Sequence, residues 1–358
     1  MEKFDDFLDM LPNTRETSFY MWGTGNTAQM YHEGIAREEG ITIEGYIDNN
    51  PEKWERMFLG KQVLSPRKYH GNSDGPVLIC TAQNAVLHAV REQISLGGGT
   101  GYSVDEWIFS RHKEELREVY KSLEDDESKE IFLQVLLHRL TWEPLQEKYV
   151  SEQQYFAVKD FRVRRNDDVF IDCGAFVGDT VERYIWQMDG IFHQIMAFEP
   201  DPKNCRALEK RIGRLREEWN IPVGNIEIYP YGIGEREDDV VIGRYEDNRG
   251  LGSRIRTTDE KRCDDIVVRM VSLDGFFAGR SDRATFIKAD IESYEYKMLL
   301  GAEQVIRNHR PRMAVCIYHN PTDMWSIPLL LKKFNPDYKF AIRHHSYSLD
   351  ETVLYAYM

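Results

Sequence analysis

The chain has 358 residues, 42% of them hydrophobic, with a formal net charge of −14 and a sequence pI near 5.3. This length predicts two domains of ordinary size, and the acidic balance argues against a nucleic-acid backbone as partner. The first residues lack the pattern of a secretion signal, no apolar run reaches membrane-spanning length, and five scattered cysteines lack paired metal-ligand spacing. These features predict a reduced, cytoplasmic location.

Residues 1–110 predict a first Rossmann-like domain. It is expected to contain strands at 18–22, 41–47 and 76–81 and helices through 36 and over 82–96. Gly23 and Gly25 lie in a G-x-G-x-x-A turn after the first strand, and Asp48 ends the second. This setting predicts a nucleotide or nucleotide-sugar site at Gly23, Gly25 and Asp48, although such a unit also occurs as a packing module. No catalytic Tyr-x-x-x-Lys pair follows it.

The next segment is expected to connect two domains. Glycines at 97–99 and 101 resemble a phosphate loop, but no Lys-Ser or Lys-Thr follows, so a flexible surface turn is expected. From 111 to 149 apolar residues recur at helical spacing, which predicts a helical linker.

The stretch 169–180 predicts the central site of the second domain. An unbroken apolar strand ends at Asp172, and Gly174 and Gly178 permit a tight turn before a helix that begins at 179–180. The wide glycine spacing differs from the dinucleotide fingerprint and suits a cofactor without pyrophosphate, such as S-adenosylmethionine. Glu199 ends the next strand about 20 residues further on, the position of an acid that binds ribose hydroxyls; the alternative is a solvated acid at a strand end.

Further elements complete a domain over 150–358. Strands are expected at 225–232, 284–292 and 313–318, with a polar insertion or hairpin over 238–268 and a closing antiparallel pair at 338–344 and 352–357. The fold class is therefore α/β with two Rossmann-like domains. The second is expected to have a seven-stranded methyltransferase-type sheet with a reversed C-terminal hairpin.

From Val169 onward the chain resembles the FkbM family of S-adenosylmethionine-dependent methyltransferases. The resemblance lies in the ordered blocks 170–180, 198–200, 272–274, 287–295, 300–302 and 310–311. It implies cofactor-binding roles for Asp172, Gly174, Ala175, Phe176, Gly178, Thr180, Glu199, Pro200, Gly232 and Asp290. Members usually have Asn where Phe176 stands and Gly where Ser293 stands. The first 110 residues resemble a module found ahead of sugar-modifying domains, which hints at polysaccharide biosynthesis.

Charged and imidazole side chains are expected at the carboxyl ends of two neighbouring strands. Lys288, Asp290 and Glu292 end one, and His319 ends the next, so they should face the ligand crevice. A hydroxyl acceptor needs a base, for which His319 is the first candidate, with Asp290 and Lys288 as further catalytic residues. A structural ion-pair network is the alternative for Lys288. One of His344 and His345 could join the site.

A metal site at the same residues is a further interpretation, although it is not the favoured one. Asp290, Glu292 and His319 offer carboxylate and imidazole ligands, which suit manganese, iron or zinc.

The favoured hypothesis is an O-methyltransferase that acts on a hydroxyl of a small molecule or saccharide. The alternatives are a nicotinamide-dependent sugar-nucleotide enzyme that uses the first domain and a non-catalytic cofactor-binding protein. The acceptor and the oligomeric state are left open.

Overall fold

The computed structural model of the chain describes residues 2–32, 39–81, 83–245, 252–256 and 266–358. It divides into two compact units, and each is described by itself. Unit 1 comprises Met1–Arg117 and Leu133–Leu145, and unit 2 comprises Glu118–Phe132 and Gln146–Met358. The division falls within α5 (Lys113–Ser122) and α6 (Asp126–Thr141), so residues of the expected linker 111–149 are shared between the units.

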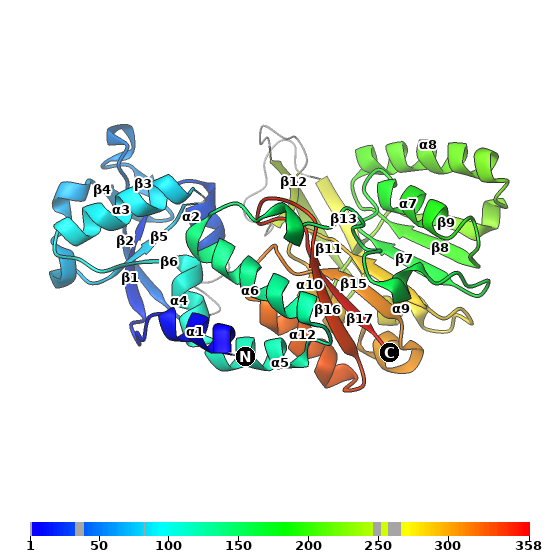
Figure 1. Cartoon of the computed structure of the whole chain (residues 1–358). Coiled ribbons are helices and arrows are strands. Elements are labelled where there is room, and N and C mark those ends of the chain that lie inside the picture. The colour runs from blue at the N-terminus through cyan, green and yellow to red at the C-terminus, as the bar shows by residue number, and fades with distance from the viewer. Residues whose placement is uncertain (1, 33–38, 82, 246–251, 257–265) are drawn as a thin grey trace. The chain divides into compact units, whose positions relative to one another are not determined.

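Unit 1 is built on a six-stranded sheet in the order β3-β4-β2-β1-β5-β6 (Figure 1). All neighbouring strands are parallel except β3 and β4. Its strands are β1 (Ser18–Trp22), β2 (Thr42–Ile47), β3 (Met57–Phe58), β4 (Lys61–Leu64), β5 (Val77–Ile79) and β6 (Gly101–Ser103). Its helices are α1 (Glu2–Met10), α2 (Asn26–Tyr31), α3 (Asn84–Leu96) and α4 (Val104–Arg111). The expected Rossmann-like arrangement is confirmed.

The core of unit 1 forms because α3 carries apolar residues at helical spacing. Leu87, Val90 and Ile94 pack with β5 and with Trp22 and Tyr69. α2 covers Asn26–Tyr31, and the remainder of the helix predicted through residue 36 falls on residues 33–38, which lie outside the described residues. The glycine run is not wholly a turn, because Gly101 begins β6 and pairs with Val77. Short 3-10 helices in this unit are Pro51–Lys53, Pro66–Lys68 and Gly71–Ser73.

Unit 2 is built on a seven-stranded sheet in the order β16-β17-β15-β14-β7-β8-β9. Only β17 runs against its neighbours, so the predicted methyltransferase-type sheet with a reversed C-terminal hairpin is confirmed. The strands are β7 (Val169–Cys173), β8 (Gln194–Phe198), β9 (Ile226–Tyr229), β14 (Phe286–Ala289), β15 (Arg312–Cys316), β16 (Lys339–His344) and β17 (Thr352–Tyr357).

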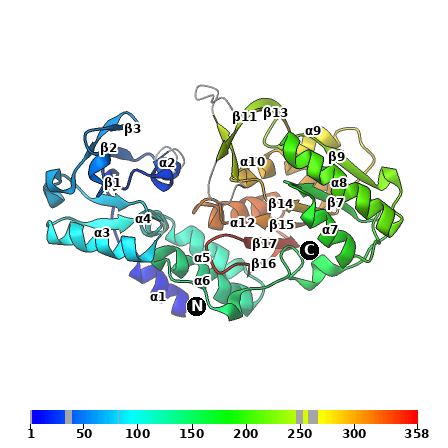
Figure 2. The ribbon, with the colours of Figure 1, turned by 90° about the horizontal axis from the view of Figure 1, so that it is seen from above.

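Helices cover this sheet. They are α7 (Asp179–Gln187), α8 (Pro202–Trp219), α9 (Leu273–Phe277), α10 (Glu295–Leu300), α11 (Glu303–His309) and α12 (Asp323–Phe334), with 3-10 helices at Glu147–Tyr149, Lys159–Arg162 and Val223–Asn225. Figures 1 and 2 show α7 and α8 side by side against the β7–β9 part of the sheet. Every residue of β7, β14 and β15 is buried, as expected for central parallel strands covered on both faces.

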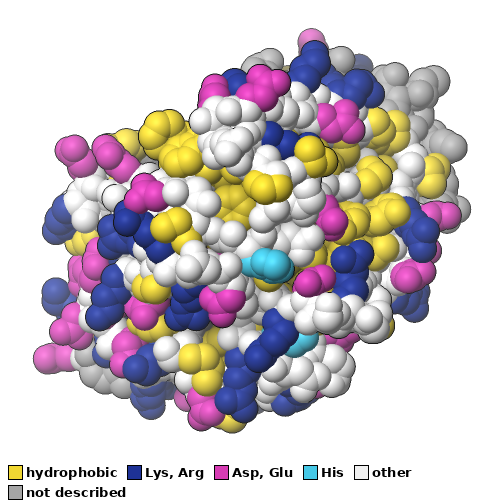
Figure 3. Space-filling model, turned by 90° about the vertical axis from the view of Figure 1, so that its right-hand side faces the viewer, with side chains coloured by type: hydrophobic (Ala, Val, Ile, Leu, Met, Phe, Trp, Pro, Cys, Tyr) yellow, Lys and Arg dark blue, Asp and Glu magenta, His cyan; other side chains and the backbone are white. Residues whose placement is uncertain are grey.

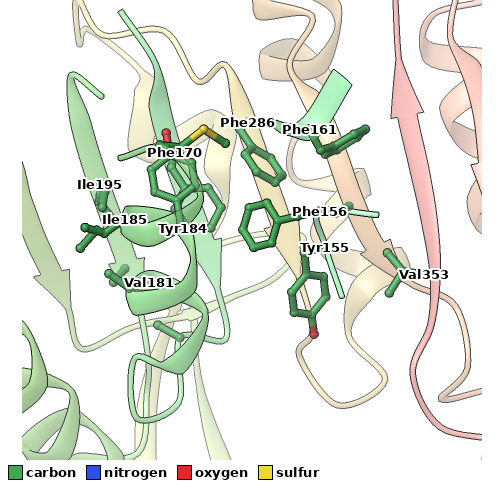
Figure 4. Packing of buried hydrophobic residues seen from close by; sticks show 14 of the residues in the cluster. Tyr155, Phe156, Phe161, Phe170, Val181, Tyr184, Ile185, Ile195, Phe286 and Val353 are labelled. Atoms are coloured by element: carbon green, nitrogen blue, oxygen red, sulfur yellow. The ribbon is translucent and has the colours of Figure 1, made fainter. Parts of the chain in front are cut away.

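Aromatic rings fill the core beneath these central strands. Phe170 and Tyr184 stack with ring centroids 4.3 Å apart, and Phe286 packs between them and the rings of Phe156 and Phe161 (Figure 4). This cluster joins the strands to α7 and to the segment around 155–161. It holds the carboxyl ends of β7, β8 and β14 in a fixed arrangement, and the candidate site lies at those ends.

The expected insertion over 238–268 forms part of a second sheet. Its order is β10-β13-β11-β12, from β10 (Gly232–Ile233), β11 (Asp238–Tyr245), β12 (Gly252–Arg256) and β13 (Ile266–Val271). Strands β11 and β12 form an antiparallel hairpin. Residues 246–251 and 257–265 of the insertion lie outside the described chain.

The strand at one edge of this sheet, β16, is covered along its outer side by the segment that enters unit 2. Glu124 N donates to Phe340 O over 2.8 Å, Ile342 N to Ser128 Oγ over 2.9 Å, and Ser151 N to His344 O over 2.8 Å. Covering an edge strand in this way protects its backbone from pairing with other chains. On the face in Figure 3, the described Lys and Arg side chains are interspersed with Asp and Glu instead of forming one basic area.

Candidate active site

A cavity of about 330 Å³ lies in unit 2 at the carboxyl ends of β7, β8 and β14. The predicted site residues that line it are Gly174, Phe176, Thr180, Glu199, Pro200, Gly232, Lys288, Asp290 and Glu292. Ala175, Gly178, Asp172 and His319 are not among the lining residues. Open α/β sheets bind ligands outside the carboxyl ends of their strands, which is where this cavity lies.

The glycine turn after β7 requires both of its glycines. Gly174 has φ +84°, and a Cβ there would lie 2.0 Å from Asp290 O. Gly178 also has φ +84°, and a Cβ would lie 2.7 Å from Leu208 Cδ1. Gly178 therefore serves packing against α8, and the buried Ala175 belongs to the hydrophobic core. Their predicted cofactor roles are indirect in this geometry.

Phe176 and Ser293 are among the residues at the site whose backbone conformations L side chains rarely take. Phe176 has φ +46° and Ser293 has φ +78°. Asn and Gly, the residues usual at these positions in the resembling family, tolerate this left-handed region best. The two departures therefore add local strain beside the cavity.

Beneath the turn, Lys288 and Asp172 form a buried ion pair with Nζ and Oδ1 3.1 Å apart. Lys288 Nζ also donates to Gly174 O over 2.8 Å. Burial lowers the pKa of Lys288, but the carboxylates of Asp172 and Asp290 outweigh it and raise that pKa above its usual value. Lys288 therefore keeps its proton. The ion pair therefore stabilises the turn, and Asp172 does not line the cavity.

Glu199 lies at the end of β8, where it receives three hydrogen bonds. Its Oε2 accepts from Phe176 N over 2.9 Å, and its Oε1 accepts from Asp201 N over 2.9 Å and Asn204 Nδ2 over 3.2 Å. Burial raises the pKa of Glu199 to about 7, although these donors oppose the shift. Its carboxylate is thus oriented by the turn on one side and by the start of α8 on the other, and it lines the cavity.

Asp290 lies just beyond β14, which spans Phe286–Ala289 and is shorter than the expected strand over 284–292. Its Oδ2 accepts from Tyr155 OH over 2.8 Å and its Oδ1 from Tyr318 OH over 3.3 Å. In Figure 4 the hydroxyl of Tyr155 points away from the neighbouring rings. Burial raises the pKa of Asp290, but Lys288 and His319 outweigh it and hold the pKa below its usual range. Asp290 is therefore a stable carboxylate at the cavity wall.

His319 lies among three carboxylates with only 8% of its side chain exposed. Its Nδ1 is 3.1 Å from Glu295 Oε1, and its Nε2 is 3.6 Å from Asp290 Oδ1 and 3.8 Å from Glu292 Oε2. Burial lowers the pKa of His319, but Glu295, Asp290 and Glu292 raise it to about 10. An imidazolium has no free lone pair at neutral pH, so this arrangement does not favour its predicted role as base.

The candidate metal ligands differ in one residue from the predicted set. Among the described residues, ligand atoms of Asp290, Glu295 and His319 lie within 4.8 Å of one another. Glu295 thus takes the place expected for Glu292, whose side chain is 51% exposed. Any metal here would displace the proton that His319 holds between the carboxylates. A metal stays a prediction, and a test follows in the Discussion.

The rings of His344 and His345, at the end of β16, form hydrogen bonds with neighbouring residues. The ring of His344 contacts Thr352 Oγ1 at 2.8 Å and Ser348 O at 2.9 Å. The ring of His345 contacts Ser151 O at 2.6 Å, and burial lowers the pKa of this imidazole to about 4. Neither lines the cavity. The sequence could not reveal two cavity-lining residues that lie nearby, Gln154 and Glu351, because neither is part of a motif.

The glycine turn of unit 1 borders a separate hollow of about 210 Å³. Gly23, Gly25 and Asp48 line it, as predicted. Asp48 Oδ2, however, already accepts from Thr24 N over 3.0 Å and from Lys53 Nζ over 2.9 Å. A ribose could reach this carboxylate only by exchanging those bonds. A nucleotide or nucleotide sugar at this site stays a prediction, and the geometry does not favour the nicotinamide alternative.

The seven-stranded sheet with one reversed strand, together with a cavity beside a glycine turn and an acid at the next strand end, defines the S-adenosylmethionine-dependent methyltransferase class. Residues 172–348 match the methyltransferase FkbM domain. Unit 2 therefore contains, over residues 172–348, a domain of the FkbM family of S-adenosylmethionine-dependent methyltransferases.

The chain is also similar to solved structures, the first of which covers nearly all of it. A methyltransferase FkbM from Methylobacillus flagellatus KT is similar with a TM-score of 0.57 and 20% identity, over 99% of this chain and 98% of that one. An rRNA methylase from Streptococcus thermophilus is similar over 54% of this chain and 87% of that one, with 11% identity and a TM-score of 0.32. A putative methyltransferase from Streptococcus mutans in complex with SAH is similar over 55% and 92%, with 8% identity and a TM-score of 0.34.

No curated protein matches the chain. Within the described residues, none of the helices has the length and apolar character needed to cross a membrane.

Proposed function

We propose that this protein transfers the methyl group of S-adenosylmethionine to a hydroxyl group of a saccharide or another small molecule. The main support for this proposal is that a single cavity has both a cofactor wall and a wall of hydrogen-bonding side chains. The cofactor wall comprises Gly174, Phe176, Thr180, Glu199 and Pro200. The wall of hydrogen-bonding side chains comprises Gln154, Tyr155, Tyr318, Asp290 and Glu351.

The charge of the cavity supports a cationic donor. Six acidic residues line it, Asp179, Glu199, Asp201, Asp290, Glu292 and Glu351, against the single lysine, Lys288, among the described lining residues. S-adenosylmethionine carries a sulfonium cation that its demethylated product has lost. A negative field therefore favours the donor over the product, which assists both binding and release.

The wall of hydrogen-bonding side chains supports a polar acceptor. Phenol, amide and carboxylate groups can hydrogen-bond several hydroxyls of a polyol at once. Methyl transfer is an in-line displacement in which the protein mainly aligns donor and acceptor, so this wall would orient the attacking oxygen. A saccharide acceptor accords with the polysaccharide role that the N-terminal resemblance hints at.

The experiment has two stages. Calorimetry of the whole chain with S-adenosylmethionine and with its demethylated product is expected to show binding of both. Incubation of the protein and donor with methyl glucoside, methyl galactoside, UDP-glucose, glycerol and catechol is then expected to give a methyl ether and the demethylated product. Binding without methylation of any hydroxyl in the panel, but with methylation of an amine, would replace the proposal with an N-methyltransferase.

A further inference from the structure

Glu351 is an acidic residue of the cavity that is partly buried and lightly held by the protein. It lies in the turn between β16 and β17, with φ +71°, and its backbone O accepts from His345 N over 3.0 Å. Gln154 Nε2 donates to Glu351 Oε2, the one hydrogen bond that the described residues give this carboxylate. The side chain lines the cavity together with Tyr155 and Tyr318.

Three of the other five acids of the cavity are committed to structural contacts. Glu199 receives three donors, Asp290 two phenol hydroxyls, and Asp201 Oδ1 accepts from Lys203 N over 2.6 Å at the start of α8. Asp179 and Glu292 have exposed or largely exposed side chains, in which solvent competes for any acceptor proton. His319 does not line the cavity, and its ring nitrogens lie against Glu295, Asp290 and Glu292. A base must have a free lone pair within the cavity, and Glu351 meets that condition best.

We propose that Glu351 is the general base that removes the proton from the acceptor hydroxyl, an inference that rests on the proposed hydroxyl methylation. The proton passes from the acceptor oxygen to a carboxylate oxygen of Glu351 as that oxygen forms its bond to the methyl carbon. The bond between the methyl carbon and sulfur breaks, and its electron pair stays on sulfur. The products are a methyl ether, the neutral thioether of the demethylated cofactor, and protonated Glu351, which returns its proton to solvent.

The electrostatic surroundings suit this task. Burial raises the pKa of Glu351, the carboxylates of Asp290 and Asp350 raise it further, and His319 and Lys288 lower it, with a result of about 7. A general base works best when its pKa lies near the working pH. Gln154 can keep its hydrogen bond while the other oxygen takes up the proton, so the side chain stays oriented through the cycle.

Glu351 also lies outside the matched FkbM domain, which ends at residue 348. The turn is brought to the cavity by the antiparallel pairing of β16 and β17, with His344 opposite Thr352. The base is thus contributed by the last hairpin of the chain, whereas the cofactor wall is contributed by β7, β8 and α7.

The test compares Glu351→Gln with Asp350→Asn in the full chain, on whichever hydroxyl of the panel the wild type methylates. Glu351→Gln keeps the shape and should bind S-adenosylmethionine with an affinity of the same order as the wild type. Its turnover should fall about 10²–10⁴-fold, the usual contribution of a general base. Asp350→Asn removes a neighbouring charge outside the cavity, so its maximal rate should be unchanged while the midpoint of its pH profile moves to lower pH.

The wild-type rate should rise with pH through a midpoint near 7 and then level off. Infrared difference spectra of wild type minus Glu351→Gln provide a measurement that needs no acceptor: a carboxyl band that disappears with a midpoint near 7 supports the proposal. A band that has already disappeared below pH 5 overturns it. An active wild type with an equally active Glu351→Gln overturns the role of Glu351 and leaves the methyltransferase intact. A wild type that binds no S-adenosylmethionine overturns the proposed function itself.

Discussion

Lys288 Nζ lies 3.1 Å from Asp172 Oδ1, and the two side chains are 3% and 0% exposed. Lys288 also donates to Gly174 O, so one buried cation joins β14 to the turn after β7. Lys288 therefore ties β14 to the glycine turn, which lines the cavity.

We expect Lys288→Met to lower the free energy of unfolding by about 3–5 kcal/mol, because it leaves the Asp172 carboxylate buried without its partner. The double variant Asp172→Asn with Lys288→Met should recover a large part of that loss, since no unpaired charge remains from the pair. Urea unfolding measures both. A single variant as stable as the wild type would show that the pair contributes nothing.

Gly174→Ala should destabilise the fold by about 1–3 kcal/mol and weaken S-adenosylmethionine binding, because φ is +84° and the new Cβ would lie 2.0 Å from Asp290 O. Gly213→Ala is the matched control. It lies within α8, where a Cβ meets nothing within 4 Å, and it should stabilise by about 0.5–1 kcal/mol. Thermal unfolding separates the two. Similar effects at both positions would contradict the close contact at Gly174.

Glu199→Ala should weaken S-adenosylmethionine binding at least tenfold, because hydrogen bonds to a charged acceptor contribute about 1.5–3 kcal/mol each. Calorimetry measures the affinity, and the exposed helix residue Glu209 supplies a control in Glu209→Ala, expected to bind normally. Unchanged affinity in Glu199→Ala would show that this acid serves only the turn, through Phe176 N and Asp201 N.

The His319 imidazolium should make stability depend on pH. Its pKa rises from the ordinary 6.5 to about 10 in the folded chain, because Glu295, Asp290 and Glu292 outweigh burial. The stabilisation is therefore complete below about pH 6.5 and is lost as pH rises toward 10. His319→Gln should lower the free energy of unfolding by about 3–5 kcal/mol at pH 6, and the deficit should shrink toward pH 10. A deficit that is constant over this range would mean that the ring acts only by packing.

Chelation tests the remaining metal hypothesis at Asp290, Glu295 and His319. Because the imidazolium already neutralises these carboxylates, treatment with EDTA should change neither the melting temperature nor the methylation rate. Loss of activity on chelation, restored by manganese or magnesium, would instead show that a metal replaces the proton of His319.

Much of the fold could be predicted from the sequence, because its signals are local. An unbroken apolar run predicts a covered parallel strand at β7, and glycines at 174 and 178 predict a turn that requires positive φ. The acid at the end of β8 and the reversed hairpin at the end of the chain follow from equally short patterns. These patterns, with the FkbM resemblance, sufficed for the class of protein.

The roles of individual charged groups were decided only by the tertiary structure. Asp172 and Lys288 belong to different strands, and the pairing of β7 with β14 places them side by side. His319 is a plausible base in isolation, yet Glu295, Asp290 and Glu292 surround it and keep it protonated. Glu351 meets Gln154, nearly 200 residues away in sequence, only when the last hairpin closes. A pKa depends on burial and on charges within a few ångströms, and these neighbours come from distant segments that no local pattern relates.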